Sequence, residues 1–234
     1  MSSFPKTVCV VGMGYIGLPL AALLAESGVS VIGVDVDQSI VDKLNKGEAH
    51  IPEKGFSEIV HAAVESGRLR AVTVPESADA FVLAVPTPVL ENHTPNMGYV
   101  DAAVLAIAPV LKSGDLIVLE STSPIGAIEK ICDRLAELRT ELTFPNQVGE
   151  DADVMLACCP ERIMPGNMLS ELKTNSRVIG GMSQASTQAA LAIYSKFVSG
   201  DLVSTDSRTA AATKLVENSF RDVNIAFANE LAAT

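Results

Sequence analysis

Three glycines near the amino terminus constrain the fold of this chain more than any other feature. They follow the apolar run at residues 8–11 as Gly12, Gly14 and Gly17, and an alanine- and leucine-rich stretch comes after them. Gly12 permits a tight turn off a strand, Gly14 lets the backbone approach a pyrophosphate, and Gly17 lets a helix pack closely on the sheet. The spacing therefore predicts a strand–turn–helix unit of the dinucleotide-binding type.

An acidic residue completes this pattern about one strand later. The apolar segment 31–34 ends at Asp35, where a carboxylate can accept both ribose hydroxyls of an adenosine and would repel a 2′-phosphate. We therefore expect NAD as the cofactor, in preference to NADP. Tyr15 and Ile16 stand inside the glycine motif, at the positive end of the predicted helix, and we place them in the same site. Asp37 is expected to cap the next helix instead.

The uncharged segment 8–25 is just long enough to be considered as a membrane span. Its three glycines, Pro19 and the apolar strand that follows it argue against that interpretation. No clear cleavage site follows it either, so it does not resemble a secretory signal. We expect a cytoplasmic protein.

Composition narrows the classes of partner. The 234 residues are 48% hydrophobic and carry a formal net charge of −11, with a pI near 4.7, which argues against a nucleic-acid or anionic-membrane surface. The four cysteines, Cys9, Cys132, Cys158 and Cys159, show no metal-ligand spacing. We expect free thiols in a reducing compartment and no metal.

Apolar runs alternate with helical stretches along the whole chain, which predicts an α/β protein with a Rossmann-like, doubly wound, mostly parallel sheet. The segments 86–97 and 160–176 are expected to be irregular loops. The expected strands are 7–12, 30–35, 70–74, 80–85, 115–119, 152–158, 176–180 and 201–204, and the expected helices are 15–27, 38–46, 56–66, 99–111, 125–138, 184–197 and 208–233.

Two polar segments follow predicted strands and should lie over the cofactor, because open α/β sheets bind ligands beyond the carboxyl ends of their strands. The first contains Pro86 and Thr87, and the second contains Ser121 and Thr122. Either segment could instead be an ordinary proline-rich turn, with Ser123 capping the helix that follows.

Two further pairs of residues could carry chemistry. Glu161 and Arg162 follow a strand in a loop framed by proline and glycine, where they could serve as a general base and an anion-binding fork, or form a surface ion pair. Lys214 and Asn218 share one helix face and could hold a substrate oxygen that gains charge, or simply face solvent. Another face of that helix is apolar and makes a dimer plausible; it carries Val216, Phe220, Val223, Phe227 and Leu231.

Taken together, these segments resemble the UDP-glucose/GDP-mannose dehydrogenase family, and within it the branch that acts on UDP-N-acetyl-D-mannosamine. The resemblance runs from Val8 to Leu231, and segment 217–230 points to that branch. The most specific stretches are 12–19, 121–124, 159–162 with 165–166, and 214–231. The resemblance implies a biosynthetic enzyme of polysaccharide precursors that oxidises the C6 alcohol of a nucleotide sugar to a carboxylate with two NAD, through a cysteine thioester that water releases.

The resemblance also implies residue roles. Thr122 and Glu161 would position or activate the hydrolytic water, and Lys214 and Asn218 would stabilise oxyanion character and bind the UDP-sugar. Arg177 would lie near the cofactor.

One departure from the family pattern matters. In the family the nucleophilic cysteine lies downstream of the Lys/Asn helix, whereas this chain ends at Thr234 with helical periodicity still running. For Cys158 and Cys159 a packing role is favoured over substitution for that thiol. We therefore expect an NAD-binding domain at 1–206 and the first part of a central helical domain at 207–234, which together bind NAD but form no uronate. A β-hydroxyacid-type dehydrogenase and a non-catalytic NAD-binding or dimerising module remain alternatives.

Overall fold

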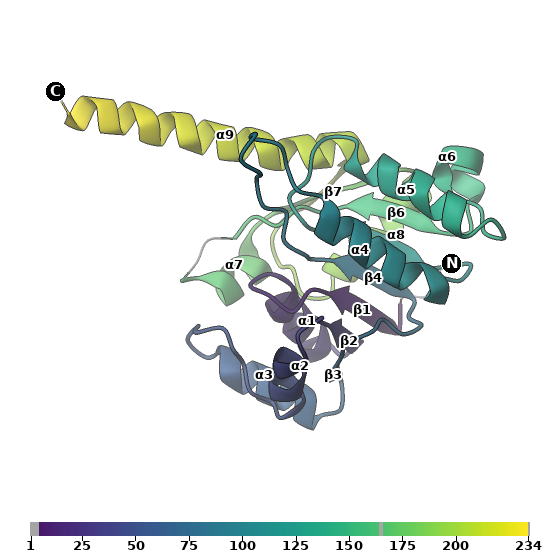
Figure 1. Cartoon of the computed structure of the whole chain (residues 1–234). Coiled ribbons are helices and arrows are strands. Elements are labelled where there is room, and N and C mark those ends of the chain that lie inside the picture. The colour runs from purple at the N-terminus through teal and green to yellow at the C-terminus, as the bar shows by residue number, and fades with distance from the viewer. Residues whose placement is uncertain (1–4, 164–165, 234) are drawn as a thin grey trace.

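The computed structural model describes residues 5–163 and 166–233, which form an eight-stranded sheet with helices on both faces (Figure 1). The strand order is β3-β2-β1-β4-β5-β6-β7-β8. The strands are β1 (Thr7–Val11), β2 (Ser30–Val34), β3 (Leu69–Val72), β4 (Ala80–Leu83), β5 (Leu116–Leu119), β6 (Met155–Cys158), β7 (Arg177–Gly181) and β8 (Leu202–Asp206). Of the residues singled out above, Pro165 and Thr234 lie outside the described residues.

The helices connect these strands and cover the sheet. They are α1 (Gly17–Glu26), α2 (Gln38–Asn45), α3 (Phe56–Glu65), α4 (Gly98–Ile107), α5 (Ala127–Leu138), α6 (Pro145–Val148), α7 (Met168–Thr174), α8 (Gln184–Tyr194) and α9 (Ser207–Ala232), with 3-10 turns at Ala108–Val110 and Gly149–Asp151. Buried residues of α1, α2, α3, α7 and α8 pack into one cluster, and those of α4, α5 and the start of α9 pack into another.

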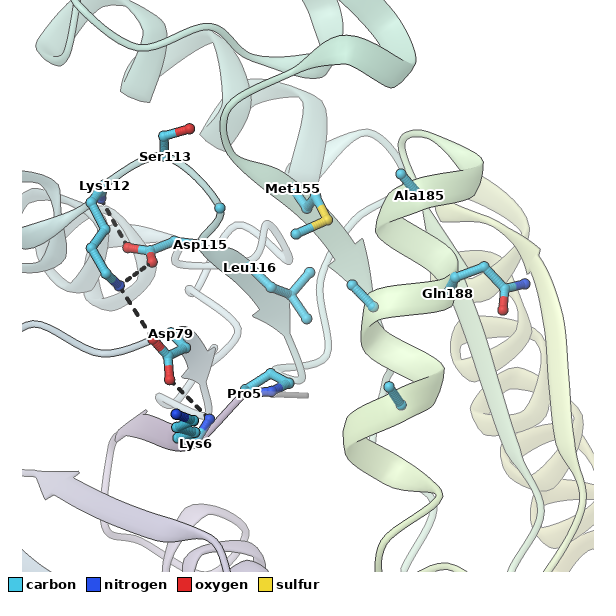
Figure 2. A pocket seen from close by; sticks show the side chains of 13 residues that line it. Pro5, Lys6, Asp79, Lys112, Ser113, Asp115, Leu116, Met155, Ala185 and Gln188 are labelled. Carbon is cyan, nitrogen blue, oxygen red and sulfur yellow. Dashed lines mark hydrogen bonds and ion pairs between the residues drawn. The ribbon is translucent and has the colours of Figure 1, made fainter. Parts of the chain in front are cut away.

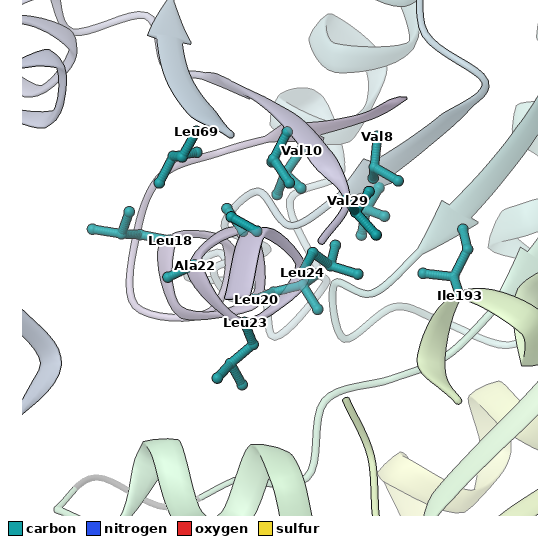
Figure 3. Packing of buried hydrophobic residues seen from close by; sticks show 14 of the residues in the cluster. Val8, Val10, Leu18, Leu20, Ala22, Leu23, Leu24, Val29, Leu69 and Ile193 are labelled. Atoms are coloured by element: carbon teal, nitrogen blue, oxygen red, sulfur yellow. The ribbon is translucent and has the colours of Figure 1, made fainter. Parts of the chain in front are cut away.

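Alternation along the central strands separates these two clusters. In β1, Val8 and Val10 belong to the first cluster while Cys9 and Val11 belong to the second, as the two-residue period of a strand requires. Figure 3 shows the first cluster, in which the leucines of α1 lie beneath the valines of β1 and Ile193 approaches from α8. Because both faces are covered, the central strands are apolar throughout, which is how the sequence reads.

Chain direction changes once in the sheet. The pairs from β3 to β6 are parallel, β6 and β7 are antiparallel, and β7 and β8 are again parallel. The beginning of β7 therefore lies at the same edge as the carboxyl ends of β5 and β6. The strand order reverses between β1 and β4, and this switch point is where doubly wound sheets bind ligands.

The structure confirms the predicted α/β class and corrects three local details. The segment 160–176, predicted to be irregular, contains helix α7, and residues 145–148 form the unpredicted α6. Helix α5 begins at Ala127 after Gly126, which has a φ of 90° and makes no side-chain cap. The predicted capping role of Ser123 is therefore wrong.

Helix α9 runs away from the body of the molecule, and the carboxyl end of the chain lies at its far tip (Figure 1). Its first turns pack against β6, β7 and β8. Most of its remaining side chains are exposed. Among the helices in the described ranges, none combines the length and apolarity that crossing a bilayer requires.

Candidate functional site at the carboxyl edge of the sheet

The glycine-rich turn joins β1 to α1 under tight backbone constraints. Gly12 has a φ of 97°, and a Cβ there would lie 2.6 Å from the Ala84 carbonyl oxygen. A Cβ on Gly17 would lie 1.8 Å from the Gly12 carbonyl oxygen. A Cβ on Gly14, in contrast, would meet no heavy atom within 4 Å. Protein packing therefore demands glycine at positions 12 and 17, while position 14 borders open space that a ligand could enter.

The carboxylate of Asp35 lies beside this turn. One oxygen accepts the backbone N–H of Met13 and the other accepts that of Asp37, each over 3.0 Å. Asp37 itself caps α2, accepting the N–H of Ser39 over 2.8 Å, as predicted. The two aspartates thus have different tasks, because only Asp35 faces the glycine turn.

A cavity of about 520 Å³ lies over this edge of the sheet. Gly12, Gly14, Tyr15, Ile16 and Asp35 line it together with the end of β4 and one face of α4. Its other walls are mostly apolar and were not singled out from the sequence; they include Val36, Thr73, Pro75, Tyr99, Ala102, Ala103 and Ala106. An apolar slot next to a glycine turn and a carboxylate fits an adenosine diphosphate, with the base in the slot and the diphosphate at the start of α1.

A second cavity, of about 180 Å³, adjoins the first through Ile16, Ala84, Val85 and Pro86. Thr87, Ser121, Thr122 and Glu161 also line it, so the structure brings the two polar loops and Glu161 together as the sequence suggested. The Ser121 hydroxyl donates to the Val85 carbonyl over 2.7 Å, and the Thr87 hydroxyl donates to the Thr122 carbonyl over 2.6 Å. These bonds fix the two loops against each other.

Glu161, which lines this cavity, faces Lys214, which does not line it. The distance from the Lys214 Nζ to the Glu161 Oε2 is 3.7 Å, and their side chains are 11% and 13% exposed. The other oxygen, Oε1, is buried and has no hydrogen-bond partner among the described residues. Burial raises the pKa of the Glu161 carboxyl, and the ammonium of Lys214 opposes that rise. The result is a carboxyl that can hold or release a proton next to a cation.

The structure does not bring Asn218 into this group. It lies one turn beyond Lys214 on α9, its side chain is exposed, and it lines neither cavity. Its predicted contact with substrate stays a prediction.

Arg162 was expected to bind an anion or to pair with Glu161 at the surface, but it contacts Glu217 instead. Its Nε donates to the Glu217 Oε2 over 3.0 Å, its Nη2 also contacts the Glu217 Oε1, and its Nη1 donates to the Ser176 carbonyl over 3.2 Å. The fork that we predicted to bind an anion or pair at the surface therefore holds α9 against the 160–176 segment.

A buried ion pair behind Glu161 was missed. The Arg177 Nη1 lies 3.2 Å from the Glu120 Oε1, and both side chains are at most 1% exposed. The Arg177 guanidinium also lies 5.7 Å from the ring centre of Tyr194. Glu120 lines the small cavity, whereas Arg177, placed near the cofactor by resemblance, lines neither cavity and lies behind it. Two features of the sequence could have indicated this pair. Glu120 directly follows the apolar strand β5, and Arg177 is the first residue of β7.

The cysteines are poor candidates for a nucleophile. All four are buried and free. Burial raises the pKa of Cys159 to about 12 and that of Cys132 to about 11, and it raises the pKa of Cys158 further. The packing role favoured for Cys158 and Cys159 agrees with this environment.

Another cavity, of about 830 Å³, lies at the opposite edge of the sheet, beside residues that precede β1, β4 and β5 (Figure 2). The Lys112 Nζ lies 2.5 Å from Asp115 and 3.5 Å from Asp79, and Asp79 also accepts the backbone N–H of Lys6. The carboxylates that line this cavity thus already pair with Lys112, and no residue of the predicted site lines it. Within the described ranges, no three His, Cys, Asp or Glu side chains are grouped to hold a metal ion.

Comparison with known proteins agrees with this geometry. Residues 6–198 match the NAD binding domain of the UDP-glucose/GDP-mannose dehydrogenase family. The chain is 54% identical over 233 residues to UDP-N-acetyl-D-mannosamine dehydrogenase of Campylobacter jejuni, covering 99% of this chain and 57% of that protein. It is 55% identical over 227 residues to NDP-N-acetyl-D-galactosaminuronic acid dehydrogenase of Ralstonia nicotianae, covering 97% and 54%.

Among solved structures, UDP-N-acetyl-mannosamine dehydrogenase Cap5O of Staphylococcus aureus superposes with a TM-score of 0.88 at 40% identity, covering 96% of this chain and 53% of that one. The chain thus spans about half the length of the relatives it matches.

Proposed function

The chain belongs to the UDP-glucose/GDP-mannose dehydrogenase family, and from that premise we propose that it is the NAD-binding part of an enzyme that oxidises the C6 alcohol of UDP-N-acetyl-D-mannosamine to the carboxylate. The observation that carries the proposal is the cavity in which Gly14 borders open space and Asp35 faces the glycine turn. The name of the Campylobacter jejuni relative, UDP-N-acetyl-D-mannosamine dehydrogenase, supports the choice of sugar substrate.

Different residues of the 520 Å³ cavity would bind different parts of NAD. Backbone N–H groups at the start of α1 would hold the diphosphate, and Gly14 leaves room for it. Asp35 would accept the ribose hydroxyls, and Tyr15, Ile16 and Pro86 would flank the ligand. NAD bound there would accept a hydride from the sugar.

The small cavity would hold the reacting end of the substrate. Thr122 and Glu161 border it, and we assign them to positioning the hydrolytic water, with Glu161 taking its proton. We assign Thr87 and Ser121 to the cofactor site, where their hydroxyls also fix the two loops against each other. Lys214 would hold an oxygen that gains negative charge, and Asn218, one turn further along α9, would bind substrate.

This chain by itself would bind cofactor without completing the oxidation. A thioester route needs an accessible thiolate, and each of the four cysteines of the sequence is buried with no free access. We assign residues 1–206 to cofactor binding, which the family match over residues 6–198 supports, and residues 207–234 to the start of a central helical domain.

We further propose a homodimer through α9 and a cytoplasmic location. Val216, Phe220, Val223 and Phe227 are each between 65% and 72% exposed, which leaves an apolar helix face without cover in the described structure. The four free cysteines suit a reducing compartment. Analytical ultracentrifugation of the chain and of Phe220→Asp would test the dimer, which requires a smaller species in the variant.

Calorimetric titration with NAD tests the central proposal. We expect saturable binding, a rise in Tm, and weaker binding of NADP. Absence of both heat and a Tm rise would overturn the proposal. Steady NADH formation from UDP-N-acetyl-D-mannosamine by this chain alone would contradict the assignment of cofactor binding without turnover.

A further inference from the structure

Two carboxyl groups border the small cavity, and each has one oxygen without a hydrogen-bond partner in the described part of the chain. Glu120 and Glu161 both line the cavity. The Glu120 Oε2 and the Glu161 Oε1 are buried and have no hydrogen-bond partner among the described residues. The backbone N–H of Glu161 also donates to the Glu120 carbonyl over 3.4 Å, so the two residues are fixed in register.

A cation stands behind each carboxyl group. Arg177, at the beginning of the antiparallel strand β7, lies 3.2 Å from the Glu120 Oε1, and Lys214, on α9, lies 3.7 Å from the Glu161 Oε2. The two acids therefore line one small cavity, each beside its own cation, and neither cation lines the cavity. Buried like charges in such an arrangement oppose each other's ionisation.

We propose that Glu120, held by Arg177, is a positioning residue for Glu161, and that the two carboxyl groups titrate as one coupled pair across the small cavity. The inference rests on the proposed role of Glu161 as the group that takes a proton from water. Lys214 and Arg177 would make Glu161 a weak base, because nearby cations favour the ionised carboxylate. The charge of Glu120 restores its basicity, so that the pair can bind one proton near neutral pH.

Several charged and titratable groups surround the pair. Burial raises the pKa of Glu120 to about 7; Arg177 opposes this rise and Glu161 adds to it. The groups that act on the pair come from five places in the fold: Arg177 begins β7, Lys214 lies on α9, Tyr194 on α8 and Glu171 on α7, and Cys159 directly follows β6.

Carbon-13 NMR of the chain labelled at glutamate carboxyl carbons, titrated with pH, measures both midpoints. In Glu161→Gln we expect the Glu120 midpoint to fall by about one pH unit, and in Glu120→Gln we expect the Glu161 midpoint to fall by the same amount, because coupling is reciprocal. Glu120→Asp keeps the charge and should leave the Glu161 midpoint near its original value. The first variant keeps the Glu120–Arg177 pair intact, so its result stands even where Glu120→Gln fails to fold.

Asp115→Asn is the matched control. Asp115 is 1% exposed, pairs with Lys112 and adjoins the other end of β5 (Figure 2), so its loss removes a buried carboxylate far from the cavity. It should move neither midpoint. Midpoints that stay unchanged in Glu161→Gln, or that move equally in Asp115→Asn, would overturn the coupling. NAD titrations of the same samples report on the proposed function separately, because cofactor binding does not require the coupling.

Discussion

Asp35 accepts a hydrogen bond from the backbone N–H of Met13 over 3.0 Å, which ties the end of β2 to the glycine-rich turn after β1. A second bond, from the N–H of Asp37, fixes the other oxygen. The carboxylate is therefore oriented by the protein before a ribose reaches it. Binding gains from such preorganisation, because less ordering is left to accompany it.

Asp35→Asn should weaken NAD binding about tenfold to a hundredfold, because hydrogen bonds to a charged acceptor are stronger than those to an amide. It should also narrow the preference for NAD over NADP, since the repulsion of a 2′-phosphate is removed. Calorimetric titration with both nucleotides measures the two effects. Asp37→Asn is the control: it caps α2 two residues away and should leave the affinity unchanged. If the unchanged chain and Asp35→Asn bound NAD with equal affinity, the placement of Asp35 in the cofactor site would be wrong.

Substitutions of two glycines in the turn should affect different quantities: Gly17→Ala the free energy of unfolding, and Gly14→Ala the affinity for NAD. In Gly17→Ala the new methyl group would lie 1.8 Å from the Gly12 carbonyl oxygen, so we expect a loss of more than about 3 kcal/mol in the free energy of unfolding. In Gly14→Ala the methyl group meets nothing, so stability should stay near its original value while NAD affinity falls at least about tenfold by crowding the diphosphate. Urea unfolding and calorimetry measure the two quantities. Gly14→Ala that binds NAD normally would contradict this placement of the diphosphate.

The cofactor half of the site was predictable because its signals are local. Gly12, Gly14, Gly17 and Asp35 belong to consecutive elements, and the spacing of turn, helix and strand fixes where they meet. The strands were predictable for a similar reason, since β1, β4 and β5 are apolar on both faces and each directly follows a charged residue. Helix α7 was missed because the prolines and glycine that precede it dominate the local pattern.

The part of the site around Glu120 and Glu161 was not predictable, because it depends on contacts between residues that lie far apart in the sequence. Glu161 meets Lys214 only because the start of α9 packs against β6 and β7. Glu120 meets Arg177 only because β7 runs antiparallel to β6, which returns its first residue to the carboxyl edge of β5. A parallel β7, as the alternating pattern suggests, would place Arg177 at the opposite edge.

The four thiols should resist alkylation in the folded chain. Each is buried, and burial raises the pKa of Cys9 and Cys159 to about 12, so little thiolate forms near neutral pH. We expect slow reaction with iodoacetamide in buffer and reaction of all four thiols in urea, measured by mass spectrometry. Rapid labelling of Cys158 or Cys159 in the folded chain would reopen the possibility that one of them is reactive.

The paired contact between Arg162 and Glu217 should hold α9 to the body of the protein. Glu217→Gln is expected to cost about 1 kcal/mol and to speed amide hydrogen exchange in the first turns of α9, because a two-pronged charged contact becomes a weaker one. Glu137→Gln breaks the more exposed pair with Arg134 and should change neither quantity. Unchanged exchange in α9 would show that its apolar packing alone fixes the helix.

Stability should fall with rising pH through the titration of Glu120. Burial raises the pKa of this carboxyl from 4.5 to about 7 in the folded chain. The folded state therefore binds the proton more tightly than the unfolded chain, so the stabilisation is complete below about pH 4.5 and is lost as the pH rises through about 7. Glu120→Gln cannot ionise and lacks this loss. Urea unfolding at a series of pH values should thus show the original chain losing stability relative to Glu120→Gln between these limits; parallel profiles would mean that Arg177 keeps Glu120 ionised throughout.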